Sequence, residues 1–454
     1  MKFLNPDYTR QTLKLAIPVM ITQLGQVSVN LFDNIIVGKL LGSDALASVS
    51  LGNAIFFSVF IFALGMSFAI PPLVSEANSQ KNDDQINKVF SHGFVINIVV
   101  GTLLMLLLIA GTPLLYHANQ PPKIIPDTIA FLNIMALSMI PFMIFQTLRE
   151  VSEGLAFTIG VTKATIIANI INVILNYVFI KGMFGFPEMG VEGSALATLI
   201  SRIFMFVFLY YVLKKEPKTE KYIREFSLKA ANFSKAMFSR MIKLGIPTSL
   251  QMFFEVTAFA AAAFICGLVS AKDIASHQVA LSMASFTFNL CIGFSVASTV
   301  LIGNKLGEKN FVELRKVGIN NIKIVFLFML FCGFFFIAGR HVLPTFFTKA
   351  EDVEVIALAS QLLIIAALFQ LSDGIQVVAL GSLRGIQDVK IPSILTFIAY
   401  WVITIPLGYY LCYVRGMGAW GMWIGLGIGL SISAILLVRR FLKLTNKKIK
   451  ANVY

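Results

Sequence analysis

Two stretches of this sequence resemble each other: LKLAIPVMITQLGQVSVNLFDNIIVGKLLGSDALA at residues 13–47 and IKLGIPTSLQMFFEVTAFAAAAFICGLVSAKDIAS at residues 242–276. Aligned without a gap, they carry identical residues at paired positions, namely Lys14 and Lys243, Leu15 and Leu244, Ile17 and Ile246, Pro18 and Pro247, Val27 and Val256, Ile36 and Ile265, Gly38 and Gly267, and Asp44 and Asp273. With the register shifted by one residue, the pairing continues at Gly65 and Gly293 and later at Gly190 and Gly418. The chain is therefore a duplication, in which each half follows the same plan.

The composition is that of a protein with many membrane spans. Of 454 residues, 57% are hydrophobic and 13% charged, and the mean hydropathy is +0.81, too apolar for a soluble globular protein. Apolar runs of about 20 residues, the length of helix that crosses a bilayer, recur along the whole chain. They predict twelve spans, near residues 13–39, 50–74, 93–116, 128–147, 164–180, 193–213, 244–269, 278–303, 321–339, 355–380, 391–412 and 420–438.

The duplication and the span count together predict the architecture. Because each half holds an even number of spans, both halves begin on the same side of the membrane and are related by a pseudo-two-fold axis along the membrane normal. We therefore expect an all-α polytopic protein of two six-helix bundles with a cleft between them, the arrangement that alternating-access transporters use. The expected parts are an N-terminal bundle (1–213), a basic cytoplasmic linker (214–243), a C-terminal bundle (244–438) and a basic cytoplasmic tail (439–454).

The distribution of Lys and Arg predicts the orientation. If both termini lie in the cytoplasm, the outer loops hold only Lys39, Lys123, Lys181, Lys272, Arg340, Lys349 and Arg415 of the 37 basic residues. This asymmetry follows the positive-inside rule and predicts that both termini are cytoplasmic. The net charge of +14 therefore indicates topology signals near anionic lipid, not a nucleic-acid partner.

Four charged residues lie inside predicted spans: Asp33, Arg202, Glu255 and Asp373. A charge at the bilayer centre costs about 2.5–3.5 kcal/mol on insertion scales, so each of the four requires an explanation. Three are acidic, which predicts a net negative cleft suited to organic cations, Na⁺ or H⁺. Arg202 is the one basic candidate partner, and we expect it to pack or to snorkel towards an interface.

Glu255 and Asp373 are too deep in their spans to reach water easily. Each lies more than ten residues from the nearest basic residue at its helix end, Lys243 and Arg384 respectively. Burial without a cation disfavours a charged carboxylate, so such a group can hold a proton, Na⁺ or a cationic drug in turn. The alternative is a structural role in an ion pair or an interhelical hydrogen bond. In the first half, the position matching Glu255 is Gln26.

Span 5 carries a stripe of amides. Asn169, Asn172 and Asn176 are spaced by three and four residues, so they share one helical face. We expect this stripe to face Asp33 or the cleft, with Thr198 as a further candidate member. Interhelical hydrogen bonding alone would also explain the stripe. The remaining candidates, Phe286 and Phe288 in span 8, would be either packing residues or aromatic faces for a substrate cation.

These features together resemble the multidrug and toxic compound extrusion (MATE) family, in its NorM-like bacterial branch. The resemblance covers the whole chain and includes LFDNIIVGKLLG around Asp33, the NxxxN of Asn172 and Asn176, Glu255, and LSDGIQVVALGSLRG around Asp373. It implies cation-coupled efflux of organic cations. It also implies that Glu255 and Asp373 bind the coupling cation, as metal ligands if that cation is Na⁺.

In the N-terminal half, Asp33, Asn172, Asn176 and Thr198 match a cluster proposed in the family for binding H⁺ or Na⁺. Some members have an aspartate where this chain has Asn176, which leaves Asp33 as the only titratable group of the cluster here. We expect a monomer in a plasma membrane, the inner membrane of a bacterium, that needs no cofactor beyond its coupling ion. Its partners would be small, cationic, partly apolar substrates and membrane lipid.

Two other functions are weighed against an antiporter. A lipid-linked oligosaccharide flippase of the same superfamily would be expected to line its cleft with Lys and Arg, and only Arg202 lies within a span here. An intramembrane enzyme would need a catalytic motif, but the sequence contains no HExxH and no GxSxG, and Asp373 is not preceded by GxG. The analysis therefore favours a secondary transporter over an enzyme.

Overall fold

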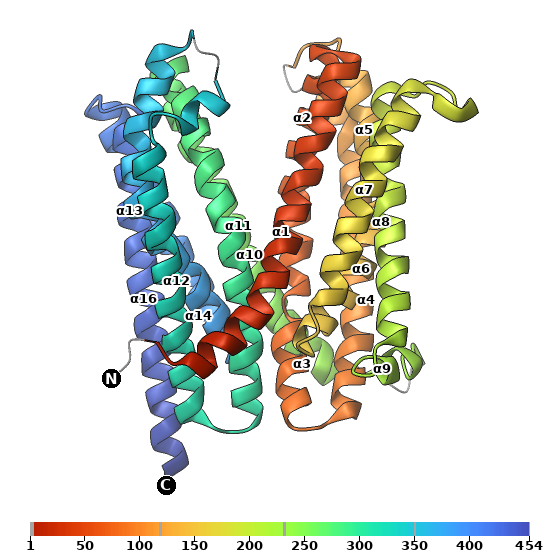
Figure 1. The fold of residues 1–454 in the computed structure, drawn as a ribbon, viewed down its shortest axis with the longest axis vertical. Coiled ribbons are helices and arrows are strands. Elements are labelled where there is room, and N and C mark those ends of the chain that lie inside the picture. Colours follow the sequence, from red (N-terminus) through yellow and green to blue (C-terminus); the bar gives the residue numbers. More distant parts are fainter. Residues whose placement is uncertain (1–3, 118–119, 230–232, 349–350, 454) are drawn as a thin grey trace. The chain divides into compact units, whose positions relative to one another are not determined.

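The computed structural model describes residues 4–117, 120–229, 233–348 and 351–453, and within these residues the fold is all-α, as expected. The helices of the first half are α1 (Pro6–Leu41), α2 (Ser43–Ser67), α3 (Ile70–Ser79), α4 (Asp83–Gly111), α5 (Ile125–Leu137), α6 (Met139–Gly154), α7 (Ile159–Lys181), α8 (Gly190–Lys215) and α9 (Glu220–Arg224) (Figure 1). Those of the second half are α10 (Lys235–Val269), α11 (Ala271–Gly307), α12 (Phe311–Gly339), α13 (Val353–Gly385), α14 (Lys390–Phe397), α15 (Ile405–Tyr409) and α16 (Ala419–Val453).

The predicted number of spans is confirmed. In the described part of the chain, 12 helices are long and apolar enough to cross a membrane. Several of them are interrupted. The eleventh, Lys390–Val414, contains two π-helical segments, Ile398–Thr404 (η5) and Tyr410–Val414 (η6), on either side of α15. Such segments widen the helical turn and redirect side chains, and they occur frequently at functional sites.

The chain divides into two compact units. Two long helices, α1 and α10, each begin in one unit and continue in the other. Unit 1 contains Met1–Met20 and Leu250–Tyr454, and unit 2 contains Ile21–Ser249. Helices α1 and α10 are therefore each shared between the units, and both contain a proline, Pro18 or Pro247, close to the change of unit. The expected division at residues 213 and 244 differs from this one, because the first turns of each half pack with the other half's helices.

Glycines allow the exchanged helix ends to pack closely. In unit 2, a Cβ added to Gly65 on α2 would lie 2.3 Å from the Cα of Ser249, and the Ser249 hydroxyl donates a hydrogen bond to the Phe62 carbonyl at 2.8 Å. In unit 1, a Cβ on Gly293 would lie 2.7 Å from the Ala16 carbonyl oxygen. Gly65 and Gly293 are the paired glycines of the sequence repeat, so the duplication repeats this close crossing in both units.

The first part of α1 is tied to unit 1 by buried hydrogen bonds. The Thr12 hydroxyl lies 2.7 Å from Asn321 Oδ1 and 2.8 Å from its own helix's Tyr8 carbonyl. The Asn321 amide in turn donates to Ser298 Oγ at 3.2 Å, and Ser298 pairs with Ser382 at 2.8 Å. This chain of contacts links α1 through α12 and α11 to α13.

Thr12→Val should destabilise unit 1 moderately. Valine has nearly the same shape but leaves Asn321 Oδ1 buried without the threonine donor, at a cost of about 1–3 kcal/mol. We expect the midpoint of thermal unfolding in detergent to fall by a few degrees, at about 2–4 °C per kcal/mol. Thr345→Val, at an exposed threonine bonded only within its own turn, is the matched control. Equal midpoints for the two variants would contradict the structural importance of this contact.

The second part of α1, which carries Asp33, is held in unit 2. Arg149 on α6 donates from Nη2 to Gln23 Oε1 at 3.1 Å and from Nε to Glu153 at 2.7 Å. Two residues further along α1, the Asn169 amide on α7 donates to the Gly25 carbonyl at 2.8 Å. Contacts from two neighbouring helices therefore fix the position of α1 next to α7.

The described residues of the basic linker dock on α4. Tyr222 and Lys221 of α9 both contact Asp83, at 2.6 and 2.7 Å. Burial, followed by the hydrogen bond to Asp83, raises the pKa of Tyr222 to about 12, so it remains a neutral donor. Further along, the Ser234 amide donates to His92 Nε2 at 2.8 Å. These contacts make the linker part of unit 2.

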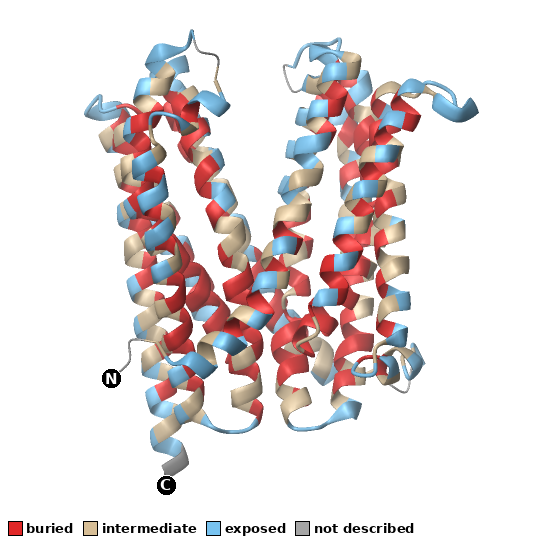
Figure 2. Ribbon diagram, in the orientation of Figure 1, coloured by how far each residue is buried: buried red, intermediate tan, exposed pale blue. Residues whose placement is uncertain are grey.

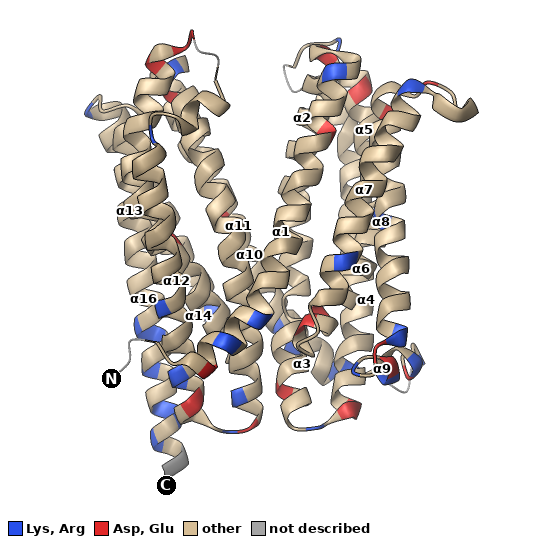
Figure 3. Ribbon diagram, in the orientation of Figure 1, with Lys and Arg blue, Asp and Glu red and all other residues tan. Residues whose placement is uncertain are grey.

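Burial and charge follow the expected pattern within each unit. Buried residues line the sides of helices that face other helices of the same unit (Figure 2). Lys and Arg gather along the C-terminal part of α16 in unit 1 and around α9 in unit 2 (Figure 3). The middle of the spans contains few charges, and those few lie at the sites described next.

Candidate functional site

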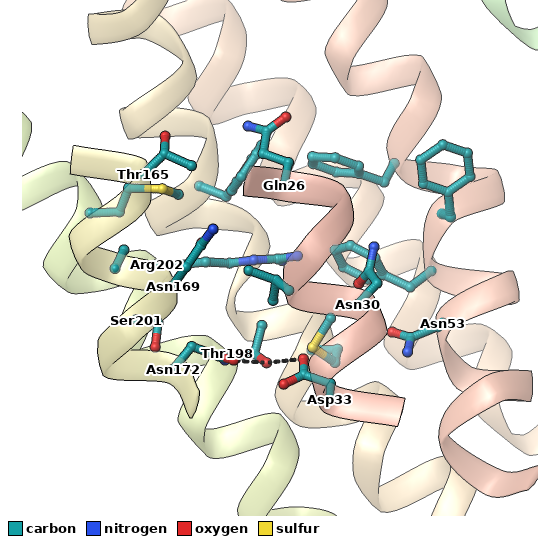
Figure 4. A pocket seen from close by; sticks show the side chains of 18 of the residues that line it. Gln26, Asn30, Asp33, Asn53, Thr165, Asn169, Asn172, Thr198, Ser201 and Arg202 are labelled. Atoms are coloured by element: carbon teal, nitrogen blue, oxygen red, sulfur yellow. Dashed lines mark hydrogen bonds between the residues drawn. The ribbon is translucent and has the colours of Figure 1, made fainter. Parts of the chain in front are cut away.

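Unit 2 contains a cavity of about 390 Å³ between α1, α2, α5, α6, α7 and α8 (Figure 4). This volume falls within the usual range for small-molecule sites. One wall is aromatic and apolar, and another carries side-chain amides and two charges. The lining residues used below are Gln26, Asn30, Asp33, Asn53, Phe56, Phe60, Phe142, Asn169, Asn172, Thr198 and Arg202. We call it the unit 2 cavity.

Asp33 lies at one end of this cavity in a hydrogen-bonded cluster. Its Oδ1 accepts from the Asn176 amide at 2.7 Å and its Oδ2 from the Thr198 hydroxyl at 3.4 Å. Asn172 donates to Thr198 Oγ1 at 3.3 Å, and the Asn176 amide also lies 3.2 Å from Asn172 Oδ1. Asp33, Asn172, Asn176 and Thr198 are all buried, and the structure thus brings together the N-half cluster that the sequence predicted.

Arg202 enters the same cavity from α8. Its Nη1 donates to Ser138 Oγ at 2.6 Å, and its guanidinium carbon lies 4.9 Å from the Phe56 ring centre and 5.0 Å from that of Phe142. Stacking of this kind holds a guanidinium inside an apolar region. The expectation that Arg202 would pack is confirmed, but it reaches the cavity wall instead of snorkelling to an interface.

A second cluster lies in unit 1, around Glu255 on α10. Glu255 Oε1 accepts from the Tyr400 hydroxyl at 3.1 Å and from the Gln376 amide at 3.2 Å, and Oε2 accepts from the Gln251 amide at 3.2 Å. Gln376 also donates to the Tyr400 oxygen at 2.9 Å. The carboxylate therefore receives neutral donors on both oxygens.

Asp373 completes the unit 1 cluster. It lies three residues before Gln376 on α13, and its side chain is buried, with 3% exposed. The Asp373 and Glu255 carboxylates are close enough to interact electrostatically. None of the ion pairs in the described residues includes either acid, although the charge of Arg384, at the far end of α13, acts on Glu255 electrostatically. Two buried carboxylates that repel each other are stable together only if a proton or another cation is shared between them. This arrangement suits a small exchangeable cation.

The unit 1 cluster offers oxygen atoms to such an ion. In the described ranges, no three His, Cys, Asp or Glu side chains gather as a metal centre. Carboxylate, amide and hydroxyl oxygens from Glu255, Asp373, Gln376 and Tyr400 are instead the ligands that hard cations prefer. A proton shared by the two acids would satisfy the same electrostatic requirement.

The other predicted residues are distributed as follows. Gln26 lines the unit 2 cavity, so the position that matches Glu255 in the repeat also belongs to a polar site. Phe286 and Phe288 lie on α11, and Phe286 is 52% exposed, so neither is placed by a described contact next to the acids. A role for them in substrate binding stays a prediction.

Sequence reasoning missed three members of the unit 1 cluster. Gln251 and Gln376 had a usable signal, since they lie four residues before Glu255 and three after Asp373, on the same helical faces as the acids. Tyr400 had no such signal, because its contact depends on the π-helical segment in which it lies.

Comparison with known proteins shows the family to which this chain belongs. The family model MatE matches residues 18–178 and 247–410, one match in each half of the repeat. The chain belongs to the MATE family. It is 35% identical to the multidrug resistance protein NorM of Photobacterium profundum, over 95% of this chain and 94% of that protein. It is also 32% identical to the multidrug resistance protein MdtK of Yersinia pseudotuberculosis, over 95% and 94% of the two chains.

Solved MATE structures share the fold. An outward-facing multidrug resistance MATE transporter superposes with a TM-score of 0.89 at 20% identity, covering 97% of this chain and 96% of that one. The eukaryotic MATE transporter AtDTX14 superposes with a TM-score of 0.87 at 18% identity, covering 98% and 99%. The family match and the multidrug resistance relatives make this protein a multi-pass membrane transporter, and the intramembrane enzyme considered from the sequence is set aside.

Proposed function

We propose that this MATE protein exports small, cationic, partly apolar molecules, drugs among them, in exchange for Na⁺ or H⁺. The names of its NorM and MdtK relatives, multidrug resistance proteins, support efflux as the direction and drugs as the substrates. The observation that carries the coupling is the pair of buried acids in unit 1, Glu255 and Asp373, which interact with each other electrostatically. The hydrogen bonds to Glu255 come from the neutral donors Gln251, Gln376 and Tyr400. Such a pair requires a cation.

The proposed cycle assigns different tasks to the two clusters. The coupling cation enters from outside onto Glu255 and Asp373, or onto Asp33, and its binding weakens the affinity for the drug, which is released outward. In the inward-facing form, drug binding in turn releases the cation. Coupling requires each ligand to bind the two states differently, and reciprocity makes each one displace the other. Entry of one positive charge supplies about 2.3 kcal/mol per 100 mV of membrane potential.

The distribution of Lys and Arg supports a membrane location and an orientation. The Lys and Arg asymmetry supports a bacterial plasma membrane with both termini in the cytoplasm. We propose a monomer, because each unit has a buried acidic cluster of its own. The flippase alternative has less support, since the unit 2 cavity contains a single arginine beside an aspartate and would bind a pyrophosphate poorly.

Inverted membrane vesicles test this function. In such vesicles an exporter moves a cationic fluorescent dye from the bath into the lumen, driven by ions that leave the lumen. We expect dye uptake with a Na⁺-loaded lumen or with an acidic lumen, abolished by an ionophore that collapses the effective gradient. Vesicles without the protein are the control. If neither gradient drives uptake, cation-coupled export is wrong.

A further inference from the structure

Three contacts join the π-helical segment η5 and the residue before it to α10, the helix that carries Glu255. Trp401 of η5 donates from Nε1 to the Phe254 carbonyl at 3.1 Å. Its neighbour Tyr400 donates from its hydroxyl to Glu255 Oε1, also at 3.1 Å. The ring of Phe397, directly before η5, lies 4.9 Å from the ring of Phe254, measured between their centres. These contacts therefore hold α10 at two adjacent residues, one of which is the buried acid.

Trp401 acts on the backbone of α10. A carbonyl oxygen has two lone pairs, so that of Phe254 can accept the indole N–H as well as a hydrogen bond within the helix. The peptide group that contains this carbonyl also contains the Glu255 nitrogen. The indole bond therefore fixes the point on the backbone from which the Glu255 side chain extends to where it interacts with Asp373.

The π-helical geometry of η5 is supported by residues that do not contact the acids. The Thr404 hydroxyl donates to the Ala399 carbonyl, five residues earlier, at 2.9 Å. Pro406 follows η5 and has no N–H, so a regular α-helical ladder cannot continue across it. On α16, Gly429 leaves room for the Thr404 side chain, which a Cβ at that position would overlap. Because a π-helical turn redirects side chains, these residues determine where the η5 side chains point.

The attraction between a carboxylate and a small cation falls with distance, so it depends on where the carboxylate is held. We propose that Trp401 is a positioning residue for ion coupling, which holds Glu255 at the place where it shares a cation with Asp373. The geometry of η5 then sets the affinity of the ion site through a side chain that is not itself a ligand of the ion. This inference rests on the proposed function.

The test measures the ion dependence of dye uptake into inverted vesicles. Trp401→Phe removes the N–H donor and keeps an aromatic ring, and the loss of one neutral hydrogen bond predicts about two- to tenfold weaker ion binding. With Na⁺ as the driving ion, the half-saturating Na⁺ concentration should rise by that factor. With H⁺, the lumenal pH at half-maximal uptake should fall by up to about one unit, because acids that move apart share a proton less well. The maximal rate at saturating ion should change far less.

A matched control and a second variant separate positioning from folding. Trp420 lies on α16, and its Nε1 has no hydrogen-bond partner among the described residues, so Trp420→Phe loses the same volume and should keep the normal ion dependence. If Trp401→Phe does not fold, Thr404→Val takes its place, because it removes the hydroxyl that bonds the Ala399 carbonyl. It should weaken ion binding several-fold, whereas Thr404→Ser, which keeps a hydroxyl, should not.

Three results would overturn the inference. The first is an unchanged half-saturating concentration or pH in folded Trp401→Phe, or in Thr404→Val where that variant is used. The second is a lower maximal rate at unchanged half-saturation, which would give Trp401 a purely structural role. The third is an equal shift in Trp420→Phe. Absence of ion-driven uptake by the unmodified protein would instead refute the proposed function.

Discussion

Glu255→Gln is expected to abolish ion-driven dye uptake into inverted vesicles. Glutamine keeps the size of the side chain and can still accept hydrogen bonds from Tyr400 and Gln376 through its amide oxygen, so the fold should survive. It cannot hold a proton or offer a negative charge to Na⁺. Removing one partner from a buried charge interaction typically costs about 3–5 kcal/mol, which corresponds to a loss of at least about 100-fold. The measurement is the initial rate of uptake under whichever gradient drives the unmodified protein.

The matched control is Glu354→Gln, the same substitution at an exposed glutamate at the start of α13. It should transport at the normal rate. Asp373→Asn should fail in the same way as Glu255→Gln, because the two acids share the cation. If Glu255→Gln folds and still couples uptake to the ion gradient, the carboxylate has only a structural role, and the coupling site must be sought at Asp33.

The unit 2 cluster was predictable because its residues follow regular helical spacing. Asn172 and Asn176 are one turn apart on an uninterrupted helix, so their amides necessarily share a face, and an aspartate in a neighbouring span is the group that such amides can stabilise. The same reasoning applied to Asp373 would have found Gln376. Polar residues are rare in apolar spans, so those that lie one helical turn apart can be assigned to one cluster from their spacing alone.

Arg202 and Tyr400 show where that reasoning ends. The sequence predicts that Arg202 packs or snorkels towards an interface, but it does not show what it packs against. Three phenylalanines on α2 and α6, distant in sequence, form the surface on which it lies. Tyr400 reaches Glu255 from a π-helical segment, whose widened turn changes the direction of every following side chain. Neither contact has a local signal, because each depends on how separate helices pack.

The boundaries of the two units were unpredictable for a related reason. The sequence repeat marks where each half begins, at residues 13 and 242, but not which half the first turns of a helix pack against. That choice is made by contacts such as Thr12 with Asn321, which join residues 309 positions apart. Periodicity identifies the apolar face of a helix, whereas the partner of that face is a property of the folded protein.

Gly65→Ala should destabilise unit 2 severely. The added methyl group would lie 2.3 Å from the Ser249 Cα and 2.6 Å from its backbone nitrogen, and backbone atoms cannot rotate away as the end of a side chain can. Either α2 and α10 separate, with loss of the hydrogen bond from Ser249 to Phe62, or the clash persists. We expect a loss of about 3 kcal/mol or more and a fall of at least about 5 °C in the thermal midpoint in detergent.

The sequence repeat makes this prediction stricter, because Gly293→Ala should have a similar effect in unit 1, where the methyl group would meet Met20 and the Ala16 carbonyl oxygen. Gly427→Ala is the matched control, since α16 leaves open space around that position. There alanine should be neutral or stabilising by up to about 1 kcal/mol, as its helix propensity requires. If the Gly65 and Gly427 variants unfold at the same temperature, α2 and α10 can separate at little cost. The close approach of Gly65 and Ser249 would then not be what holds the beginning of α10 in unit 2.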